Sequence, residues 1–110
     1  MTFAALLAEA ARIVAVMGEP IECASVTSGV LSLEWSAFSL EWKTGTPGAL
    51  RFAKVTWIPG DEEDDGVVIG VRRWREDARE AHMGQAWPTG AQLNELRAWL
   101  DGGPAPGWCS

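Results

Sequence analysis

The stretch 31–42 (LSLEWSAFSLEW) carries two sets of apolar residues that alternate with polar ones. The two sets are Leu31, Leu33 and Trp35, and Phe38, Leu40 and Trp42. Because the sets fall on opposite parities, one straight strand would point them to opposite faces of a sheet. A hairpin that reverses at Ser36 and Ala37 places all six on one face, and the alternative is a bulge that shifts the parity. Both interpretations predict a sheet with one apolar face.

Apolar residues recur at helical spacing near both ends of the chain. An N-terminal helix is predicted from the candidate N-cap Thr2 to Met17, where Gly18 and Pro20 follow as stop signals. Its apolar residues are Phe3, Leu6, Leu7, Ala10, Ile13, Val14 and Met17. A C-terminal helix is predicted after the capping box at 89–92, and Gly-Gly-Pro at 102–104 ends it. Its apolar residues are Leu93, Leu96, Trp99 and Leu100.

Three further segments have the composition of strands, at 21–27, 50–58 and 67–75. The pattern of 50–58 is mixed, since Leu50 and Phe52 fall on one parity and the other apolar residues on the opposite one. A bulge near Phe52 or burial on both faces would explain this. Residues 76–83 favour a short helix by composition.

The order of these elements is helix, about five strands, short helix and final helix. It predicts an α+β fold, in which the N-terminal helix, the short helix and the C-terminal helix pack on one face of an antiparallel sheet. We assign a single domain to residues 1–103 and a flexible tail to residues 104–110. Cys23 is expected to be a buried thiol, and Cys109, in the tail, an exposed one.

Charge is concentrated in one segment. The chain has 110 residues and a formal net charge of −6, of which five consecutive acids carry −5 and leave −1 for the rest. These acids are Asp61, Glu62, Glu63, Asp64 and Asp65. They do not form an EF-hand, because the twelfth position of such a loop is Arg72 where a bidentate Glu is required. Three interpretations remain: a solvated hairpin loop, a recognition element for a basic surface, and a looser site for a divalent cation.

The rest of the sequence excludes several functional classes. A generic nucleic-acid binder needs a broad basic field, which this chain lacks. There is no phosphate-binding loop and no G-x-S-x-G motif, and His82 is the only histidine. The apolar N-terminal stretch lacks a basic region and is interrupted by Glu9 and Arg12, unlike a signal peptide or an anchor. We therefore expect a cytoplasmic protein that is not an enzyme, binds no cofactor or metal, and does not associate with membranes.

The one basic cluster comprises Arg72, Arg73, Trp74 and Arg75, with Arg79 nearby. A phosphate or RNA contact by arginine and a stacking tryptophan is one interpretation. We favour the other, in which these arginines are neutralised by neighbouring acids or by the acidic segment itself.

These observations predict a small acidic protein-binding module. It would act as an inhibitor or immunity-type protein of phage or mobile-element kind, mimicking nucleic acid to occupy a basic surface of a partner protein. The predicted contact residues are the acids 61–65 for steering, with Trp57, Trp74 and Arg72 as anchors. One alternative is a small chaperone or assembly factor that is a homodimer through the N-terminal helix and holds an apolar client segment. A third is a small-ligand binder or enzyme that uses His82.

Overall fold

The protein was analysed as a computed structural model, which describes residues 3–27, 35–58, 66–73, 78–84 and 86–109. Within these ranges the chain forms two helices and five strands. They are α1 (Phe3–Met17), β1 (Glu22–Thr27), β2 (Trp35–Thr44), β3 (Arg51–Ile58), β4 (Gly66–Arg73), β5 (Arg79–His82) and α2 (Gly90–Leu100).

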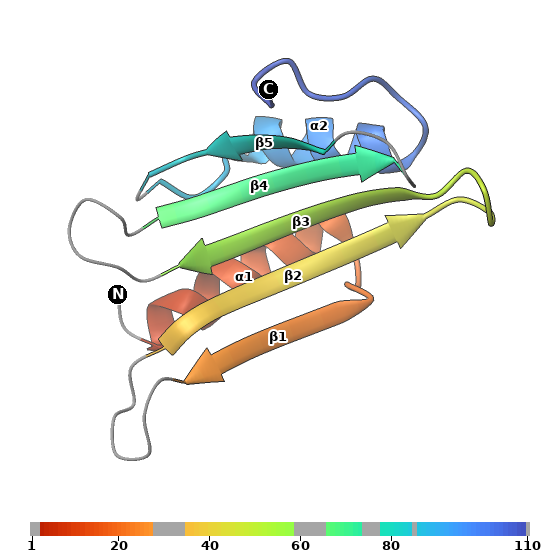
Figure 1. Cartoon of the computed structure of the whole chain (residues 1–110). Helices are drawn as coiled ribbons and strands as arrows, with labels where there is room; N and C mark the ends of the chain where they lie inside the picture. Colours follow the sequence, from red (N-terminus) through yellow and green to blue (C-terminus); the bar gives the residue numbers. More distant parts are fainter. Residues whose placement is uncertain (1–2, 28–34, 59–65, 74–77, 85, 110) are drawn as a thin grey trace.

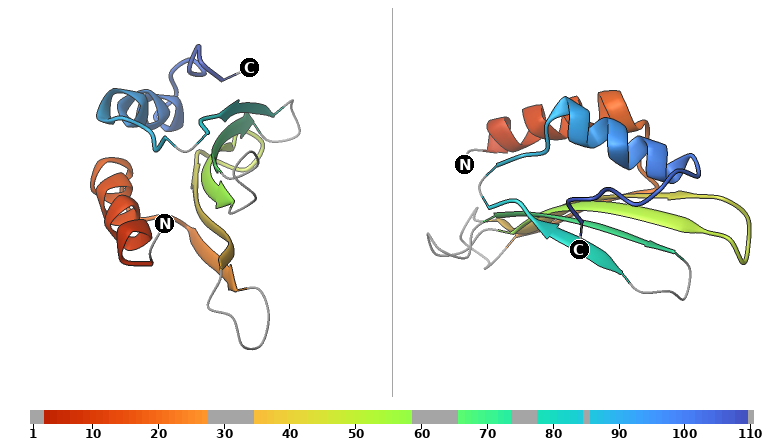
Figure 2. Two further views of the ribbon diagram at one scale, coloured as in Figure 1. Left: turned by 90° about the vertical axis from the view of Figure 1, so that its left-hand side faces the viewer. Right: turned by 90° about the horizontal axis from the view of Figure 1, so that it is seen from above.

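The strands form one antiparallel sheet in the order β1-β2-β3-β4-β5, so each strand pairs with its neighbours in sequence (Figure 1). Both helices lie on the same face of this sheet, as the two views of Figure 2 show. The predicted α+β class is therefore confirmed: an N-terminal and a C-terminal helix pack on one face of an antiparallel sheet. No helix in the described part of the chain is long and apolar enough to cross a membrane.

The core fills the space between the helices and the sheet. Residues on alternate positions of the central strands point toward the helices, because side chains of a strand alternate between its faces. The buried strand residues of this core are Leu40, Trp42, Ala53, Val55, Trp57, Val67, Ile69, Val71 and Ala81. The helices contribute Leu6, Ala10, Ile13, Met17, Leu93, Leu96, Trp99 and Leu100. Burial of this apolar surface is the main stabilising contribution to the fold.

The predicted hairpin at Ser36 and Ala37 is wrong. Residues Trp35–Thr44 form the single strand β2, which pairs with β1 on one side and β3 on the other. The pairing of β1 with β2 shifts register at one point: Val26 faces Ala37, and the next residue, Thr27, faces Trp35. Ser36 is therefore the extra residue of a bulge. A bulge was the alternative explanation for the opposite parities of the two apolar sets. The bulge prevails because Ser-Ala lacks turn chemistry, whereas β1 pairs with β2 on both sides of Ser36, from Trp35 to Glu41.

The predicted short helix at 76–83 is also wrong. Within it, Arg79–His82 form the edge strand β5, whose Ala81 pairs with Ile69 of β4 and is buried. The polar composition favoured a helix, but pairing with the free edge of β4 satisfies the backbone and overrides that weak preference. The five observed strands are therefore not the five predicted ones, although the number is the same.

The mixed pattern of β3 results from burial on both of its faces. The register of β3 with β2 and β4 runs through Phe52 without a shift, which excludes a bulge there. Phe52 is buried on the face away from the helices, where the Arg72 guanidinium carbon lies 3.9 Å from the centroid of its ring. A cation above an aromatic face is attracted by the ring quadrupole, and this long side chain also covers the ring from solvent.

The C-terminal segment, for which a flexible tail was predicted at 104–110, packs on the fold over its described residues 104–109. Residues 104–109 run beside α2 and β5 (Figures 1 and 2), and the Trp108 indole N–H donates to Glu95 Oε2 at 2.7 Å. Cys109, predicted to be exposed, is a free thiol with only 3% of its surface accessible. Burial raises the pKa of this thiol, opposed by the nearby Arg79 guanidinium and reinforced by the Glu95 carboxylate. The sequence signal for this packing is the apolar content of the segment, whose side chains gain stability when they are buried.

The C-terminal end of α1 is tied to the rest of the core by two side chains. The carbonyl of Met17 accepts a hydrogen bond from Arg97 Nη1 at 2.6 Å, and the carbonyl of Gly18 accepts one from the Trp42 indole N–H at 2.9 Å. The last carbonyls of a helix have no partner within the helix, so donors at this position stabilise it. Arg97 thereby links α2 to α1.

We expect Arg97→Ala to lower the free energy of unfolding by about 1–2 kcal/mol, because a charged donor is removed from a helix end. Asp101→Asn is the matched control, since it removes the other contact of Arg97, an exposed ion pair of 3.5 Å. Such pairs contribute little, so this variant should lose less than about 0.5 kcal/mol. Urea denaturation followed by circular dichroism measures both, and equal losses would contradict the role assigned to the Met17 carbonyl.

Candidate functional site

The acidic residues Asp61 to Asp65 lie outside the described residues, but the strands on either side of them are well defined. Ile58, the last residue of β3, pairs with Gly66, the first residue of β4. The segment 59–65 therefore connects two neighbouring antiparallel strands at one end of the sheet. The chain therefore enters and leaves the acidic segment at this end of the sheet.

The arginines gather at the opposite end of the same strands. Arg51 pairs with Arg73, Phe52 with Arg72, and Val71 with Arg79. Ile58 lies seven positions after Arg51 in β3, which corresponds to about 23 Å at the usual rise of a strand. Exposed charges that far apart are largely screened, because the Debye length is about 8 Å at physiological ionic strength. The strand register thus places the two flanks of the acidic segment, Ile58 and Gly66, at the end of the sheet opposite to Arg51, Arg72 and Arg73.

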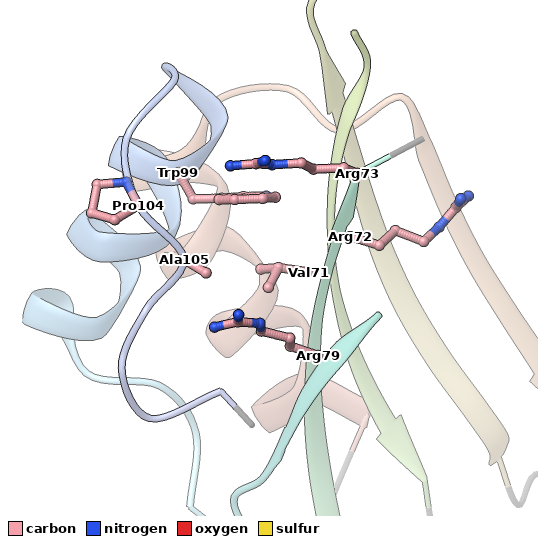
Figure 3. Close-up of a pocket in the computed structure, with 7 residues that line it drawn as sticks. All are labelled: Val71, Arg72, Arg73, Arg79, Trp99, Pro104 and Ala105. Atoms are coloured by element: carbon pink, nitrogen blue, oxygen red, sulfur yellow. The ribbon is translucent and has the colours of Figure 1, made fainter. Parts of the chain in front are cut away.

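A pocket of about 680 Å³ lies at the arginine end, between β4 and β5 on one side and the C-terminal segment on the other (Figure 3). Its lining residues are Val71, Arg72, Arg73, Arg79, Trp99, Pro104 and Ala105. Arg73 and Arg79 extend from the sheet toward the C-terminal segment, whereas Arg72 points to the other side of β4. No carboxylate is among these lining residues, so the described walls of the pocket are apolar and cationic.

Trp99 organises the arginines at this pocket. The guanidinium carbons of Arg51 and Arg73 lie 4.4 and 5.6 Å from the centroid of its ring. The ring is held in place because its indole N–H donates to the carbonyl of Phe52 at 3.1 Å. Arg51 also donates to the carbonyls of Trp99 and Gly103, which joins β3 to the end of α2 and the start of the C-terminal segment. Three separate segments thus bring two cations to one aromatic ring.

The structure does not bring the predicted anchor residues together. Trp57 is 8% exposed and belongs to the core, so its ring contacts the interior rather than a partner. Arg72 is exposed at the far end of β4 from the acidic segment and lies over Phe52. Trp74 lies outside the described residues. Of the predicted contact residues, only Trp57 and Arg72 belong to the described part of the chain, and they share no surface, since Trp57 is buried and Arg72 is exposed.

His82 stands apart from any enclosed site. Its side chain is 74% exposed on the edge strand β5, and its Nε2 atom lies 3.5 Å from Glu80 Oε2. These contacts do not form the closed pocket around His82 that the third hypothesis requires.

Sequence reasoning missed the combination of Arg79, Arg51 and Trp99. Trp99 was correctly assigned to the core by its helical position, but nothing local to any of the three residues points to the other two. Their proximity follows from the pairing of β3, β4 and β5 and from the packing of α2, which become known only with the fold. Across the described ranges, no three His, Cys, Asp or Glu side chains lie close enough to hold a metal ion.

Comparison of the chain with protein-family models, with curated proteins and with solved structures finds no match. The functional argument therefore depends on the geometry and charge of this chain.

Proposed function

We propose that this protein is a small binding module that uses its acidic segment, residues 61–65, to occupy a basic surface of a partner protein. The observation that supports this is the register of β3 and β4, which places Ile58 and Gly66, the residues that flank segment 59–65, at the end of the strands opposite to the arginines. Five consecutive carboxylates create a concentrated negative potential that attracts a cationic partner.

The sequence next to the acidic segment strengthens this argument. The three residues that precede it in β3 are Thr56, Trp57 and Ile58, and the three that follow it in β4 are Gly66, Val67 and Val68. None of these six carries a positive charge. A concentrated negative potential of this kind increases the rate of association with a basic partner and makes binding sensitive to salt. A groove that binds nucleic acid is the kind of surface that carries such a positive field, so an inhibitor that imitates phosphates is the form of this function we favour.

The test is to neutralise all five acids, as Asp61→Asn, Glu62→Gln, Glu63→Gln, Asp64→Asn and Asp65→Asn, and to compare partner capture from a lysate at low and high salt. A matched control neutralises five acids elsewhere, at Glu9, Glu19, Glu41, Glu80 and Asp101, so that both variants have the same net charge. We expect the wild type and the control to retain the same basic proteins, with recovery falling as salt rises, and the 61–65 variant to lose them.

Two results would contradict the proposal. If both variants lose the same proteins, net charge rather than the acidic segment is responsible. If the 61–65 variant retains them, the segment has no part in the interaction. Circular dichroism of each variant must show an unchanged fold, which we expect because Asn and Gln have the size of Asp and Glu and the five control side chains are absent from the core.

The predicted homodimer through α1 stays a prediction. Leu7, expected in the buried stripe of this helix, is 47% exposed in the single chain, and Ile21 is 54% exposed. Exposed large apolar residues occur on ordinary monomers as well as at interfaces, so exposure alone does not favour the dimeric chaperone.

A further inference from the structure

We propose that the pocket between β4, β5 and the C-terminal segment binds the phosphate group of a small organic molecule. This site lies at the end of the sheet opposite to the acidic segment and does not depend on the proposed partner-binding function. The proposal is carried by the positions of Arg79 and Arg73, by the fixed ring of Trp99, and by the size and walls of the pocket (Figure 3).

Arg79 is the residue on which the proposal mainly depends. It lies on the edge strand β5, opposite Val71, and its side chain extends toward the C-terminal segment. Among the residues that the structure describes, none places a carboxylate within ion-pairing distance of its guanidinium. Two of the described carboxylates have other partners, since Glu95 accepts from Trp108 and Glu80 lies next to His82. A guanidinium on the wall of a pocket is a strong donor for an anion.

The second cation is held in a defined position. The Arg73 guanidinium lies over Trp99, and Trp99 is 4% exposed and hydrogen-bonded through its indole N–H. Arg51 lies closer still to the same ring and adds positive charge at this end of the sheet. Groups that are already positioned before a ligand binds lose less conformational entropy on binding, which increases affinity.

The chemistry of the pocket favours phosphate over other ligands. The planar guanidinium of Arg79 matches the oxygens of phosphate in paired hydrogen bonds, and the positive charges of Arg73 and Arg51 nearby favour an anion at this end of the sheet. The volume of about 680 Å³ falls in the range of small-molecule sites and exceeds what a bare ion needs. The apolar side chains of Val71, Pro104 and Ala105 would contact the organic part of the ligand. The guanidiniums of Arg51 and Arg73 already lie over the Trp99 ring, so we do not expect this ring to stack on the ligand.

Isothermal titration of the full chain with inorganic phosphate, adenosine monophosphate and adenosine tests the proposal at constant ionic strength. We expect saturable binding of the two phosphate-bearing probes and none of adenosine. Tighter binding of adenosine monophosphate than of inorganic phosphate would identify an organic phosphate as the ligand class. Equal binding would identify free phosphate, and the phosphate site itself would stand in both cases.

Arg79→Gln should weaken phosphate binding by roughly tenfold or more, because it removes one charged donor. Arg79→Lys should recover part of the affinity, since it restores the charge without the paired geometry. Lys54→Gln is the control, because it removes an exposed positive charge from the middle of β3, outside this pocket, and it should change the affinity by less than about twofold. Arg79 is exposed, so each variant should keep the thermal unfolding transition of the wild type. Absence of saturable binding, or equal weakening by Arg79→Gln and Lys54→Gln, would overturn the proposal.

Discussion

Replacement of Leu6 by alanine is expected to lower the free energy of unfolding by about 2–5 kcal/mol, the usual range for a leucine removed from a core. Leu6 is 1% exposed and lies in the core cluster between α1 and the sheet. Its neighbour Leu7 is 47% exposed on the same helix, so Leu7→Ala should cost about 1 kcal/mol or less. The pair shares the same chemistry and helix, and urea denaturation of both variants therefore measures burial alone.

A large loss for Leu7→Ala would mean that this side chain is covered in solution. In that case the unfolding midpoint should rise with protein concentration, because a dimer is stabilised by mass action. Light scattering on the same samples gives the mass directly. Equal losses for the two leucines together with a strictly monomeric mass would contradict the orientation of α1.

Deletion of residues 104–110 is expected to lower the free energy of unfolding by about 2–4 kcal/mol. The deletion removes the buried side chains of Pro106 and Cys109 and the packing of Trp108, and full burial of one apolar side chain contributes about 1.5–3 kcal/mol. Thermal and urea unfolding measure the effect. A flexible tail would instead leave stability unchanged, so this result decides between the sequence-based prediction and the observed packing.

Trp108→Phe is the matched control for this deletion. It keeps an aromatic side chain but removes the N–H that donates to Glu95. Because that hydrogen bond is exposed, we expect a loss of only about 0.5–1 kcal/mol. A loss as large as that of the deletion would mean that this one bond, rather than the buried segment, holds the C-terminus in place.

The two helices were predictable because their signals are local. The capping box of α2 forms as expected, with the Thr89 hydroxyl accepting from the Gln92 amide and the Gln92 side chain accepting from the Thr89 amide. The spacing of Leu93, Leu96 and Trp99 gave the buried face directly. In α1 the same spacing indicated the buried residues but also included Leu7, since so wide an apolar stripe does not tell which edge faces the sheet.

The strands were harder because their identity depends on partners that are distant in sequence. Arg79–His82 has no apolar alternation to mark a strand, and only the free edge of β4 makes it one. In β2 the opposite parities were noticed, but a turn and a bulge both satisfy them, and the pairing with β1 decides between the two. The candidate sites show the same limit. The acidic segment was evident from consecutive letters, whereas the phosphate pocket combines β3, β4, β5, α2 and the C-terminal segment.

The sheet precedes α2 in the chain, yet α2 supplies Leu93, Leu96 and Trp99 to its cover. During synthesis the five strands therefore emerge before the helix that shields half of their apolar side. Until then the growing sheet exposes its apolar face to water, which favours aggregation. Stable folding should begin only once α2 has been synthesised, and partners or chaperones that meet the growing polypeptide before then would encounter a sheet without this cover.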